Sequence, residues 1–585
     1  MTGTRLSLEA PRRWVFRGGP VADGAAEALA ARLSLPLPVC RLLLLRGHGD
    51  DEAARAFLKP RLELLHEPLS LTDTDTAVTR LLHAISTGEH ILVHGDYDVD
   101  GMCSAALFTR VLRSLGAAVT PFVPHRMTDG YDLSHAGVRR AAEVGAGLIL
   151  TGDCGMVAHD AVAQAAAAGI DVIVTDHHTP GATLPGAIAV LNPNRADCGY
   201  PFKGLAGAGV AFKLCAALVA RAGGDRDALR WQLDLVALAT IADLAPLTGE
   251  NRIMTHYGLR VLRETRNPGL RALMCAAGVD TAEPIAAGHV SHTLAPRLNA
   301  VGRMGAASRG VDLLLTDDAD EAVRLAQEME EENRTRQGVD RLILQQALAM
   351  LEDSFDPDTD YAIVLSSPEW HPGVIGIVAS RVVEQVHRPV ILIAEDPTTG
   401  RGRGSGRSIP AFHLFDGIHA CAPLLNRYGG HRQAAGLDID LERVPDLRRT
   451  FNEHARNVLT PDDLIAEVRV DLEIELAEAN SALCRLMRHC GPFGLGNPQP
   501  VFVARGVHID GAPREVGGGQ HLKLTLAQGT TRLPAIGFRM AERARSMDLL
   551  NGRIDVAFQL QEDTWNGRKR LQARLVDLRP HALDA

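Results

Sequence analysis

The sequence predicts an α/β protein organised around a doubly wound parallel sheet, with further, smaller domains behind it. Three observations lead to this fold class. Apolar runs of β type alternate with Ala-rich, helix-compatible stretches between about residues 90 and 250. Acidic and histidine side chains follow the ends of several of these runs. From about residue 456 the pattern changes to short β-type runs with turn residues between them. A length of 585 residues predicts roughly three or four domains.

The composition is that of a folded protein with ordinary cores, since 46% of the residues are hydrophobic and 23% are charged. Aromatic residues make up only 4%, so any binding to bases by stacking depends on few rings. The net charge of −10 argues against a uniformly basic coat, but a local basic channel remains compatible with it because salt screens charges within about 10 Å. Nine scattered cysteines without a CxxC pair fit a reducing cytosol. With no apolar stretch of transmembrane length, we expect a cytoplasmic protein that does not enter a membrane.

The elements of the predicted sheet follow one another in order. Residues 1–70 are rich in Leu, Ala and Arg, and we interpret them as an N-terminal helical segment leaning on the next domain. Helical periodicity over 77–85 precedes the first strand. The predicted strands cover 91–93, 119–123, 147–150, 172–174 and 188–191, and a predicted helix covers 160–168. Because ligands of parallel sheets bind at the carboxyl ends of strands, the residues that follow these runs are the candidates for function.

Carboxylates and imidazoles gather at these ends. They are His94, Asp96, Asp98 and Asp100 after the first strand, Asp153 after the third, Asp176, His177 and His178 after the fourth, and Asp243 after a helix-like run over 233–241. One acidic turn or one histidine pair alone is more often an ordinary surface loop. Their recurrence favours a metal site, and oxygen and nitrogen ligands without thiolate suit Mn²⁺ or Mg²⁺ equally. Two such ions sharing a carboxylate would hydrolyse a phosphoryl ester or anhydride. The sequence contains neither a P-loop nor HExxH.

The motifs at 94–101, 151–155, 176–178 and 239–244 resemble those of the DHH phosphoesterase superfamily. Further runs narrow the resemblance to the RecJ single-stranded-DNA exonucleases: 294–303, 370–376, 404–408, 429–436 and 491–498. This resemblance implies a DHH catalytic domain over 71–315, a connector helix over 316–353 and a smaller DHH-associated α/β domain over 354–455. It also implies a C-terminal OB-type β-barrel over 456–585. The connector sequence itself is charged and strongly helical.

The resemblance also implies roles for individual residues. One metal would be held by His94, Asp98 and Asp153, and a second by Asp100, Asp153, His177 and Asp243, with Asp153 bridging. Among the catalytic candidates, His178 would face the scissile phosphate and Asp176 would orient the neighbouring imidazole. Asp96 is the third catalytic candidate, although it would also suit a cap on the turn.

Substrate binding is expected from arginines and from a Gly/Arg-rich string in the smaller domain. Taken by itself, the string over 401–407, with 430–432, is more typical of a mobile surface loop. If it lies opposite a phosphoesterase site, it would instead line a basic groove. The resemblance implies that Ser405, Arg407 and Arg126 hold a terminal 5′ phosphate, with His431 nearby. Arg297 and Arg303 would line the cleft, or each could be a structural ion-pair partner. Phe502, Phe538 and Trp565 are candidate stacking rings that would equally suit the core.

The function that follows from the resemblance is a 5′→3′ exonuclease on single-stranded DNA, acting in repair and recombination with two Mn²⁺ or Mg²⁺ ions. We expect a monomer whose partners are single-stranded DNA with a 5′ end and, on duplexes, a helicase and a single-strand-binding protein. Two alternatives stay open. One is a DHH hydrolase of short oligonucleotides or small phosphoanhydrides, and the other is an inactive DNA-binding subunit.

Overall fold

The computed structural model describes residues 12–19, 23–125, 129–130, 132–304, 307–545, 547, 552–565 and 568–581. The chain divides into two compact units. The larger unit holds Phe16–Glu330 and Val470–Ala585, and the smaller holds Glu331–Arg469 with the described residues that precede Phe16. Two separate parts of the chain therefore make the larger unit, and the long helix α16 (Ala319–Ser354) runs from it into the smaller one.

The predicted doubly wound sheet is confirmed in the larger unit. Five strands lie in the order β3-β2-β4-β5-β6, and every neighbouring pair is parallel. Their bounds are β2 (His90–Gly95), β3 (Val119–Phe122), β4 (Ala146–Gly152), β5 (Asp171–Thr175) and β6 (Ala189–Leu191). The order reverses between β2 and β4, so the strand ends that carry the acidic and histidine residues meet at the edge where such sheets bind ligands.

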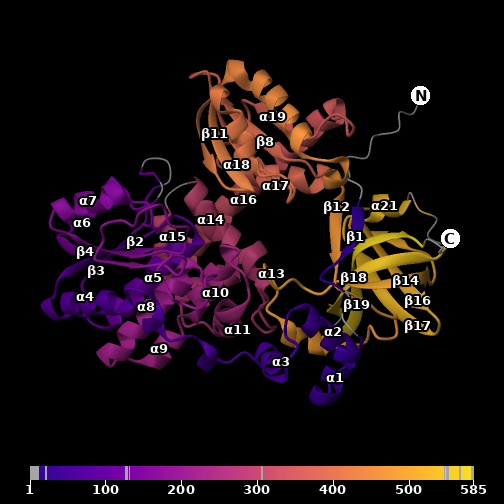
Figure 1. The fold of residues 1–585 in the computed structure, drawn as a ribbon, viewed down its shortest axis with the longest axis horizontal. Helices are drawn as coiled ribbons and strands as arrows, with labels where there is room; N and C mark the ends of the chain where they lie inside the picture. The colour runs from indigo at the N-terminus through magenta and orange to yellow at the C-terminus, as the bar shows by residue number, and fades with distance from the viewer. Residues whose placement is uncertain are drawn as a thin grey trace. The chain divides into compact units, whose positions relative to one another are not determined.

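Helices cover both faces of this sheet because its strands are apolar on both sides (Figure 1). Ile91 and Val93 of β2 belong to one core, and Leu92 between them belongs to the other. The first core contains α4 (Thr74–Thr87), α5 (Val99–Ser114) and α8 (Gly207–Ala222), and the second contains α6 (His135–Glu143) and α7 (His159–Ala167). The buried faces of these helices thereby hold the strands in place.

A helical layer completes the catalytic part of the larger unit. Its elements are α9 (Arg226–Arg230), α10 (Leu233–Ala242), α11 (Gly249–Arg263), α12 (Pro268–Ala276), α13 (Ala287–His289), η3 (Val290–Leu294), α14 (Ala295–Met304) and α15 (Ser308–Leu315). A buried ion pair between Lys213 of α8 and Glu250 of α11 joins this layer to a helix that covers the sheet. Lys213 also donates to the carbonyl of His66, and Glu250 accepts from the His66 amide and the Tyr200 hydroxyl. The network therefore ties α8, α11 and the N-terminal segment together.

The smaller unit is an α/β domain with a mixed five-stranded sheet in the order β10-β11-β9-β8-β7. Its elements are β7 (Ile363–Ser367), α17 (Ile375–Val386), β8 (Val390–Asp396), β9 (Arg401–Arg407), α18 (Leu414–Ala420), β10 (Leu425–Gly430), β11 (Ala434–Asp440) and α19 (Val444–Val458). Only β7 and β8 are parallel, and the remaining pairs are antiparallel. The smaller α/β domain expected after the connector is thus present.

The Gly/Arg string is the central strand β9 of this sheet, so the expectation of a surface loop is wrong. Its arginines and glycines alternate, and the glycine positions point into the core. A Cβ at Gly404 would lie 2.7 Å from Leu437 Cδ1, and one at Gly402 would lie 2.6 Å from Ile393 Cγ2. The glycines therefore make room for apolar neighbours within the domain, and the arginine-bearing face is left for other contacts.

The C-terminal part of the larger unit is an OB-type sheet. Seven strands lie in the order β13-β14-β18-β19-β17-β16-β15, and β14 also pairs with β16. The elements here are β13 (Leu472–Glu473), α20 (Ser481–Met487), β14 (Phe502–Ile509), β15 (Arg514–Val516), β16 (His521–Gln528), β17 (Thr531–Gly537), α21 (Ala541–Arg545), β18 (Ile554–Trp565) and β19 (Arg568–Pro580). The contact between β14 and β16 is limited to two residue pairs, so the strands form a curled sheet rather than the closed barrel expected.

The N-terminal helices pack against this OB-type sheet, which corrects the expectation that they lean on the domain next in sequence. They are α1 (Asp23–Leu33), α2 (Leu37–Leu45) and α3 (Asp51–Leu58). Leu29, Val39 and Leu42 share one hydrophobic core with Phe502 and Phe558 of the sheet. In the part of the chain that the structure describes, no single helix is long and apolar enough to span a membrane. One bent pair, Gly24–Leu33 with Leu37–Leu45, meets the requirement by length and composition alone.

The remaining pieces are short. Strand β1 (Arg12–Phe16) pairs with β12 (Ala466–Val470) in a two-stranded sheet. Short 3-10 turns connect the larger elements: η1 (Leu62–Leu64), η2 (Pro68–Ser70), η4 (Ala422–Leu424), η5 (Leu441–Arg443), η6 (Pro461–Leu464) and η7 (Arg488–Cys490).

Candidate metal centre and active site

The first acidic turn lies between β2 and α5 and is shaped by two glycines. Asp98 is the N-cap of α5, where its Oδ1 accepts a 3.0 Å hydrogen bond from the Gly101 amide. A Cβ at Gly101 would lie 2.3 Å from the Asp96 backbone nitrogen, and one at Gly95 would lie 2.4 Å from the Gly101 carbonyl oxygen. These close approaches allow the turn to fold back on itself and hold Asp96 and Asp98 next to each other.

Asp153 stands at the carboxyl end of β4 in a left-handed backbone conformation, with φ of 65°. Such a conformation is rare for residues other than glycine and often marks a functional position. Its side chain is buried against the start of α8, where a Cβ at Gly207 would lie 2.7 Å from Asp153 Oδ1. The unusual backbone turn thus aims this carboxylate at the middle of the strand ends.

Asp100 is held by the amino end of α8. Its two carboxylate oxygens accept hydrogen bonds of 2.7 Å each from the amides of Gly207 and Ala208. These amides have no partner within the helix, so the carboxylate satisfies them and the helix dipole favours its charge. The position of Asp100 therefore depends on where α8 begins.

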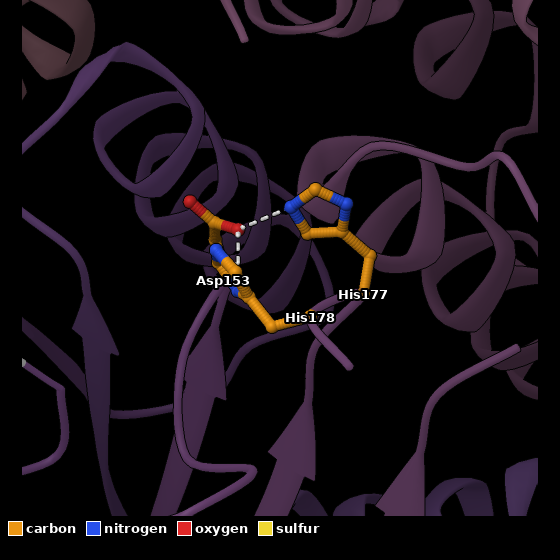
Figure 2. A group of neighbouring side chains, drawn as sticks. All are labelled: Asp153, His177 and His178. Atoms are coloured by element: carbon orange, nitrogen blue, oxygen red, sulfur yellow. Dashed lines mark ion pairs between the residues drawn. The ribbon is translucent and has the colours of Figure 1, made fainter. Parts of the chain in front are cut away.

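The histidine pair follows β5, and Asp176 organises it. Asp176 Oδ1 accepts hydrogen bonds from the amides of His177 (2.7 Å) and His178 (3.0 Å), and it lies 2.8 Å from His178 Nδ1. His177 Nε2 lies 3.1 Å from Asp153 Oδ1, and His178 Nδ1 lies 3.9 Å from the same oxygen. Figure 2 shows both imidazoles directed toward the Asp153 carboxylate. Asp176 thus fixes the loop and the imidazole of His178, while His177 reaches the central carboxylate.

Asp243 completes the arrangement from the C-terminal end of α10, where it is the C-cap. Its Oδ2 lies 3.7 Å from His177 Nε2, which is itself 3.9 Å from Asp100 Oδ2. Three sets of side chains bring one ligand atom each within 4.8 Å of one another. They are Asp153, His177 and His178; Asp100, His177 and Asp243; and Asp96, Asp98 and Asp153. These side chains, which come from positions between 96 and 243, therefore converge on one place, as the sequence patterns suggested.

His94 is fully buried beside this centre but is not part of those three sets. Its Nδ1 lies 3.5 Å from Cys154 Sγ, and that thiol also points to the His94 carbonyl oxygen at 3.8 Å. A thiol that donates to the carbonyl can accept from Nδ1–H, which leaves the lone pair on Nε2. A Cβ at Gly137 would lie 2.8 Å from His94 Nε2, so the lack of a side chain at 137 gives the ring its space.

The donor set fits divalent cations. His94 Nε2, Asp96 Oδ1, Asp153 Oδ1 and His177 Nε2 are buried without a hydrogen-bond partner among the described residues. Buried polar atoms are rarely left so, and four of them at one edge of a sheet indicate a missing positive partner. Nitrogen and carboxylate oxygen ligands are those that Mn²⁺ and Mg²⁺ accept.

The electrostatics of the centre lead to the same conclusion. Burial, followed by neighbouring carboxylates, raises the pKa of Asp96 and of Asp243 to about 8 and that of Asp153 well above its usual range. Burial lowers the pKa of His94 to about 4, so the imidazole is neutral as a ligand must be. Without a cation the carboxylates would repel one another, whereas a bound cation would favour their ionised forms.

His178 differs from the other members of the centre. Its hydrogen bond to Asp176 raises the pKa of the imidazole to about 9. The same hydrogen bond, acting against the effect of burial, lowers the pKa of Asp176. With 43% of its side chain exposed, His178 is also the most accessible of the centre's imidazoles. It is therefore the group best suited to meet an incoming anion.

Two asparagines that the sequence reasoning missed support the histidine loop. Asn192 Nδ2 donates to the carbonyl of His178 at 2.8 Å, and Asn194 Nδ2 donates to that of His177 at 2.6 Å. Both asparagines follow strand β6. The sequence signal that could have identified them is therefore the one that identified the carboxylates, namely polar residues directly after an apolar run. Asp132 was also missed; its Oδ1 accepts from the Gly155 amide beyond Asp153.

The expected substrate-binding residues differ in how the structure presents them. Arg297 donates to Glu330 Oε2 and to the Thr293 carbonyl, each at 2.6 Å, so it has the ion-pair role that had been left open. Arg126 and the side chain of Arg303 lie outside the described residues. In the smaller unit, Arg407 Nη1 lies 3.2 Å from Ser405 Oγ, and these two side chains come from the same face of β9. His431 is exposed in the turn that follows β10.

The three candidate stacking rings also differ in their exposure to solvent and in whether the structure describes them. Phe502 is buried and packs against Phe558, so it belongs to the core. Phe538 is 47% exposed and lies beside His521, with the guanidinium of Arg574 5.5 Å from its ring centre. The side chain of Trp565 lies outside the described residues. Of the two candidate rings whose side chains the structure describes, Phe538 is the one that a base could reach.

Three family models match the chain in the same order as its parts. They are the DHH family N-terminal domain over residues 90–240, the DHHA1 domain over 359–457 and the RecJ OB domain over 470–577. The matches, with the cluster of carboxylates and imidazoles at the sheet edge, define a DHH-family protein with a centre for divalent cations.

Similar proteins and solved structures identify the family within this class. The chain is 37% identical to the "Single-stranded-DNA-specific exonuclease RecJ" of Bacillus subtilis, covering 94% of this chain and 69% of the relative. It is 38% identical to that of Salmonella typhimurium over 96% and 98% of the two chains. The crystal structure of RecJ in complex with Mn²⁺ from Thermus thermophilus matches with a TM-score of 0.82 and 34% identity, over 98% of this chain and 80% of that one. A Mg²⁺ complex of the same protein matches with a TM-score of 0.77. The chain belongs to the RecJ family of single-stranded-DNA-specific exonucleases.

Proposed function

We propose that this protein is an exonuclease that degrades single-stranded DNA to mononucleotides by hydrolysing phosphodiester bonds at a centre for two divalent cations, Mn²⁺ or Mg²⁺. The observation that carries the proposal is the convergence of Asp100, Asp153 and Asp243 on His177, whose Nε2 lies 3.9, 3.1 and 3.7 Å from an oxygen of each carboxylate in turn. Membership of the RecJ family supports single-stranded DNA as the substrate. A terminal mononucleotide is the product that an enzyme acting from a strand end would release.

The proposed ligands divide into two sets that share Asp153. His94 and Asp98 would hold one cation with it, and Asp100, His177 and Asp243 would hold the other. Asp153 suits a bridging role because it belongs to two of the three clusters of ligand atoms. Asp96 belongs to the cluster of Asp98 and Asp153, so its proposed role is to support the first cation from the turn.

The chain's own groups would prepare the reaction. When bound, the cations supply an acidified water and neutralise charge on the phosphate oxygens. His178, protonated through its hydrogen bond to Asp176, would donate to a phosphate oxygen and stabilise the negative charge that develops there. Asp176 would keep that imidazole in one orientation, because its two oxygens are already fixed by the backbone of Met156, His177 and His178. His177 would hold Asp153 and Asp243 at a constant distance.

We further propose that the enzyme works in the 5′→3′ direction. In this proposal Ser405 and Arg407 would bind the terminal 5′ phosphate together with Arg126, His431 would contact the DNA backbone, and Arg303 would bind the same strand. The Arg407 guanidinium supports this role because it is preorganised by Ser405 and by the Gly406 carbonyl. In the OB-type sheet, Phe538 and Arg574 would stack on a base of the same strand.

We also propose a cellular location, an oligomeric state, partners and domain bounds for the protein. We place the protein in the cytoplasm as a monomer that takes part in DNA repair and recombination. A helicase and a single-strand-binding protein would supply and cover its substrate. We retain the division into an N-terminal segment (1–70), a catalytic domain (71–315), a connector (316–353), a DHH-associated domain (354–455) and an OB-type domain (456–585).

Release of mononucleotides from end-labelled single strands tests the proposal directly. We expect release to require Mn²⁺ or Mg²⁺, to proceed from a 5′ end and to stop at duplex DNA. Asp153→Ala should abolish turnover, whereas Asp96→Ala should leave a measurable rate, because only the former removes the bridging carboxylate. Equal residual activity in the two folded variants would contradict the bridging role. Degradation of a dinucleotide but not of a long strand would favour a hydrolase of small substrates instead.

A further inference from the structure

Leu244, which directly follows Asp243, combines backbone strain with exposure to solvent. Its φ is 58°, in the left-handed region, and its side chain is 65% exposed. The Ala245 amide bonds back to the Thr240 carbonyl at 3.1 Å, so Leu244 occupies the position past the helix end where glycine is usual. A bulky residue with positive φ is an outlier that glycine would relieve.

Stability does not account for a leucine at this position. The hydrophobic core contains Ile241 before it and Leu247 after it, whereas Leu244 itself faces solvent. The backbone is therefore strained without the gain that burial of an apolar side chain would bring. Strained residues of this kind are concentrated at functional sites, where an observed outlier is a reason to look for a function.

The segment that carries Leu244 is held firmly from the other side. The Leu247 amide donates to the Leu495 carbonyl at 2.7 Å. A Cβ at Gly494 would lie 2.7 Å from Leu247 Cδ1, and one at Gly496 would lie 3.1 Å from Pro246 Cβ. The 491–498 motif, which had no assigned role, thus packs against the residues after Leu244. It fixes the chain next to Asp243, whose carboxylate lies 3.7 Å from His177 Nε2.

We propose that Leu244 is a specificity-determining residue that packs against the deoxyribose of the nucleotide whose phosphate is bound at the metal centre. The proposal rests on the proposed function. The sugar is the part of a nucleotide next to its phosphate, and the C2′ edge of deoxyribose is apolar. A ribose would bring a 2′-hydroxyl against the leucine, where it would lose water without gaining a hydrogen-bond partner. Leu244 therefore favours DNA over RNA.

Leu244→Gly tests this, because the change removes the side chain and relieves the backbone at once. The experiment compares kcat/KM for a single-stranded DNA and an RNA of the same sequence in the full-length wild type and variant with Mn²⁺. We expect kcat/KM for DNA to fall about tenfold, mainly through KM, and that for RNA to change little, as for loss of one apolar contact. The melting temperature should stay equal or rise. Leu69→Ala, at another leucine that is 55% exposed, is the control and should change neither substrate.

Three results would overturn the inference: wild-type kcat/KM on DNA in Leu244→Gly, an equal loss on DNA and RNA, or a melting temperature lowered by several degrees. The last would mean that Leu244 serves the fold. Failure of the proposed function would look different, since the wild type itself would then release no mononucleotide from DNA.

Discussion

Replacing Lys213 with methionine would break the buried network that ties α8 to α11. Lys213 and Glu250 each expose only 2% of their side chains. The change removes the hydrogen bond to the His66 carbonyl and the one to Glu250, and it leaves the carboxylate with the His66 amide and the Tyr200 hydroxyl alone. Breaking such a pair from one side costs about 3–5 kcal/mol, because a buried charge loses its partner. For a unit of this size that corresponds to a melting temperature lower by about 3–6 °C.

The effect should reach the metal centre through the start of α8. Because the amides of Gly207 and Ala208 hold Asp100, a loosened α8 should weaken Mn²⁺ binding, which electron paramagnetic resonance of the free ion can measure at a temperature where the variant is folded. Adding Glu250→Gln to Lys213→Met removes the unpaired charge and should recover at least about 2 kcal/mol. Scanning calorimetry measures both changes. A loss below about 1 kcal/mol in the single variant, or a double variant no more stable than the single, would refute the reasoning.

Three further predictions concern other parts of the protein. Burial raises the pKa of Asp234 to about 6, so the folded state holds its proton more tightly and stability falls as pH rises from about 4 to 6. The free energy of unfolding of Asp234→Asn, measured with urea relative to the wild type, should therefore be about 1.4 kcal/mol larger at pH 8 than at pH 5. A difference between variant and wild type that does not change with pH would contradict the raised pKa. Cys154→Ala should weaken Mn²⁺ binding about tenfold in calorimetric titration by freeing the His94 ring, whereas Cys154→Ser should largely preserve it; equal losses would exclude this positioning role. Gly404→Ala should lower the free energy of unfolding by about 1–3 kcal/mol, because the added methyl group would clash with Leu437. A calorimetric transition unchanged from wild type would show that β9 shifts to accommodate it.

The sheet and the centre were predictable because both leave a local pattern in the sequence. The apolar runs that became β2, β4 and β5 are short and bounded by polar residues, and in a parallel sheet their ends meet at one edge. This is why Asp153 and His177 were expected to converge before any distance was known. Their exact partners were not predictable, since the left-handed backbone of Asp153 and the amides of α8 that hold Asp100 are set by tertiary contacts.

Of the three expectations that the structure corrects, those for the 401–407 string and for the N-terminal helices were wrong for identifiable reasons. The string over 401–407 was judged by its composition, whereas its alternation of arginine and glycine was the signal of a strand with one side packed tightly. The helices before residue 60 were assigned to the nearest domain. Their partners are strands more than 400 positions away, and Leu29 and Phe558 share a core without any local trace of it in the sequence.

That long-range core affects how the chain folds during synthesis. Helices α1–α3 leave the ribosome well before the strands that cover their apolar side, which are made only after residues 331–469 of the smaller unit. Until then Leu29, Val39 and Leu42 have no partner from β14 or β18, and nascent chains with such exposed surfaces are prone to aggregate. A chain that stops before residue 500 would keep every proposed metal ligand and still present this uncovered surface. Translation that fails near the end should therefore yield insoluble protein rather than a smaller working enzyme.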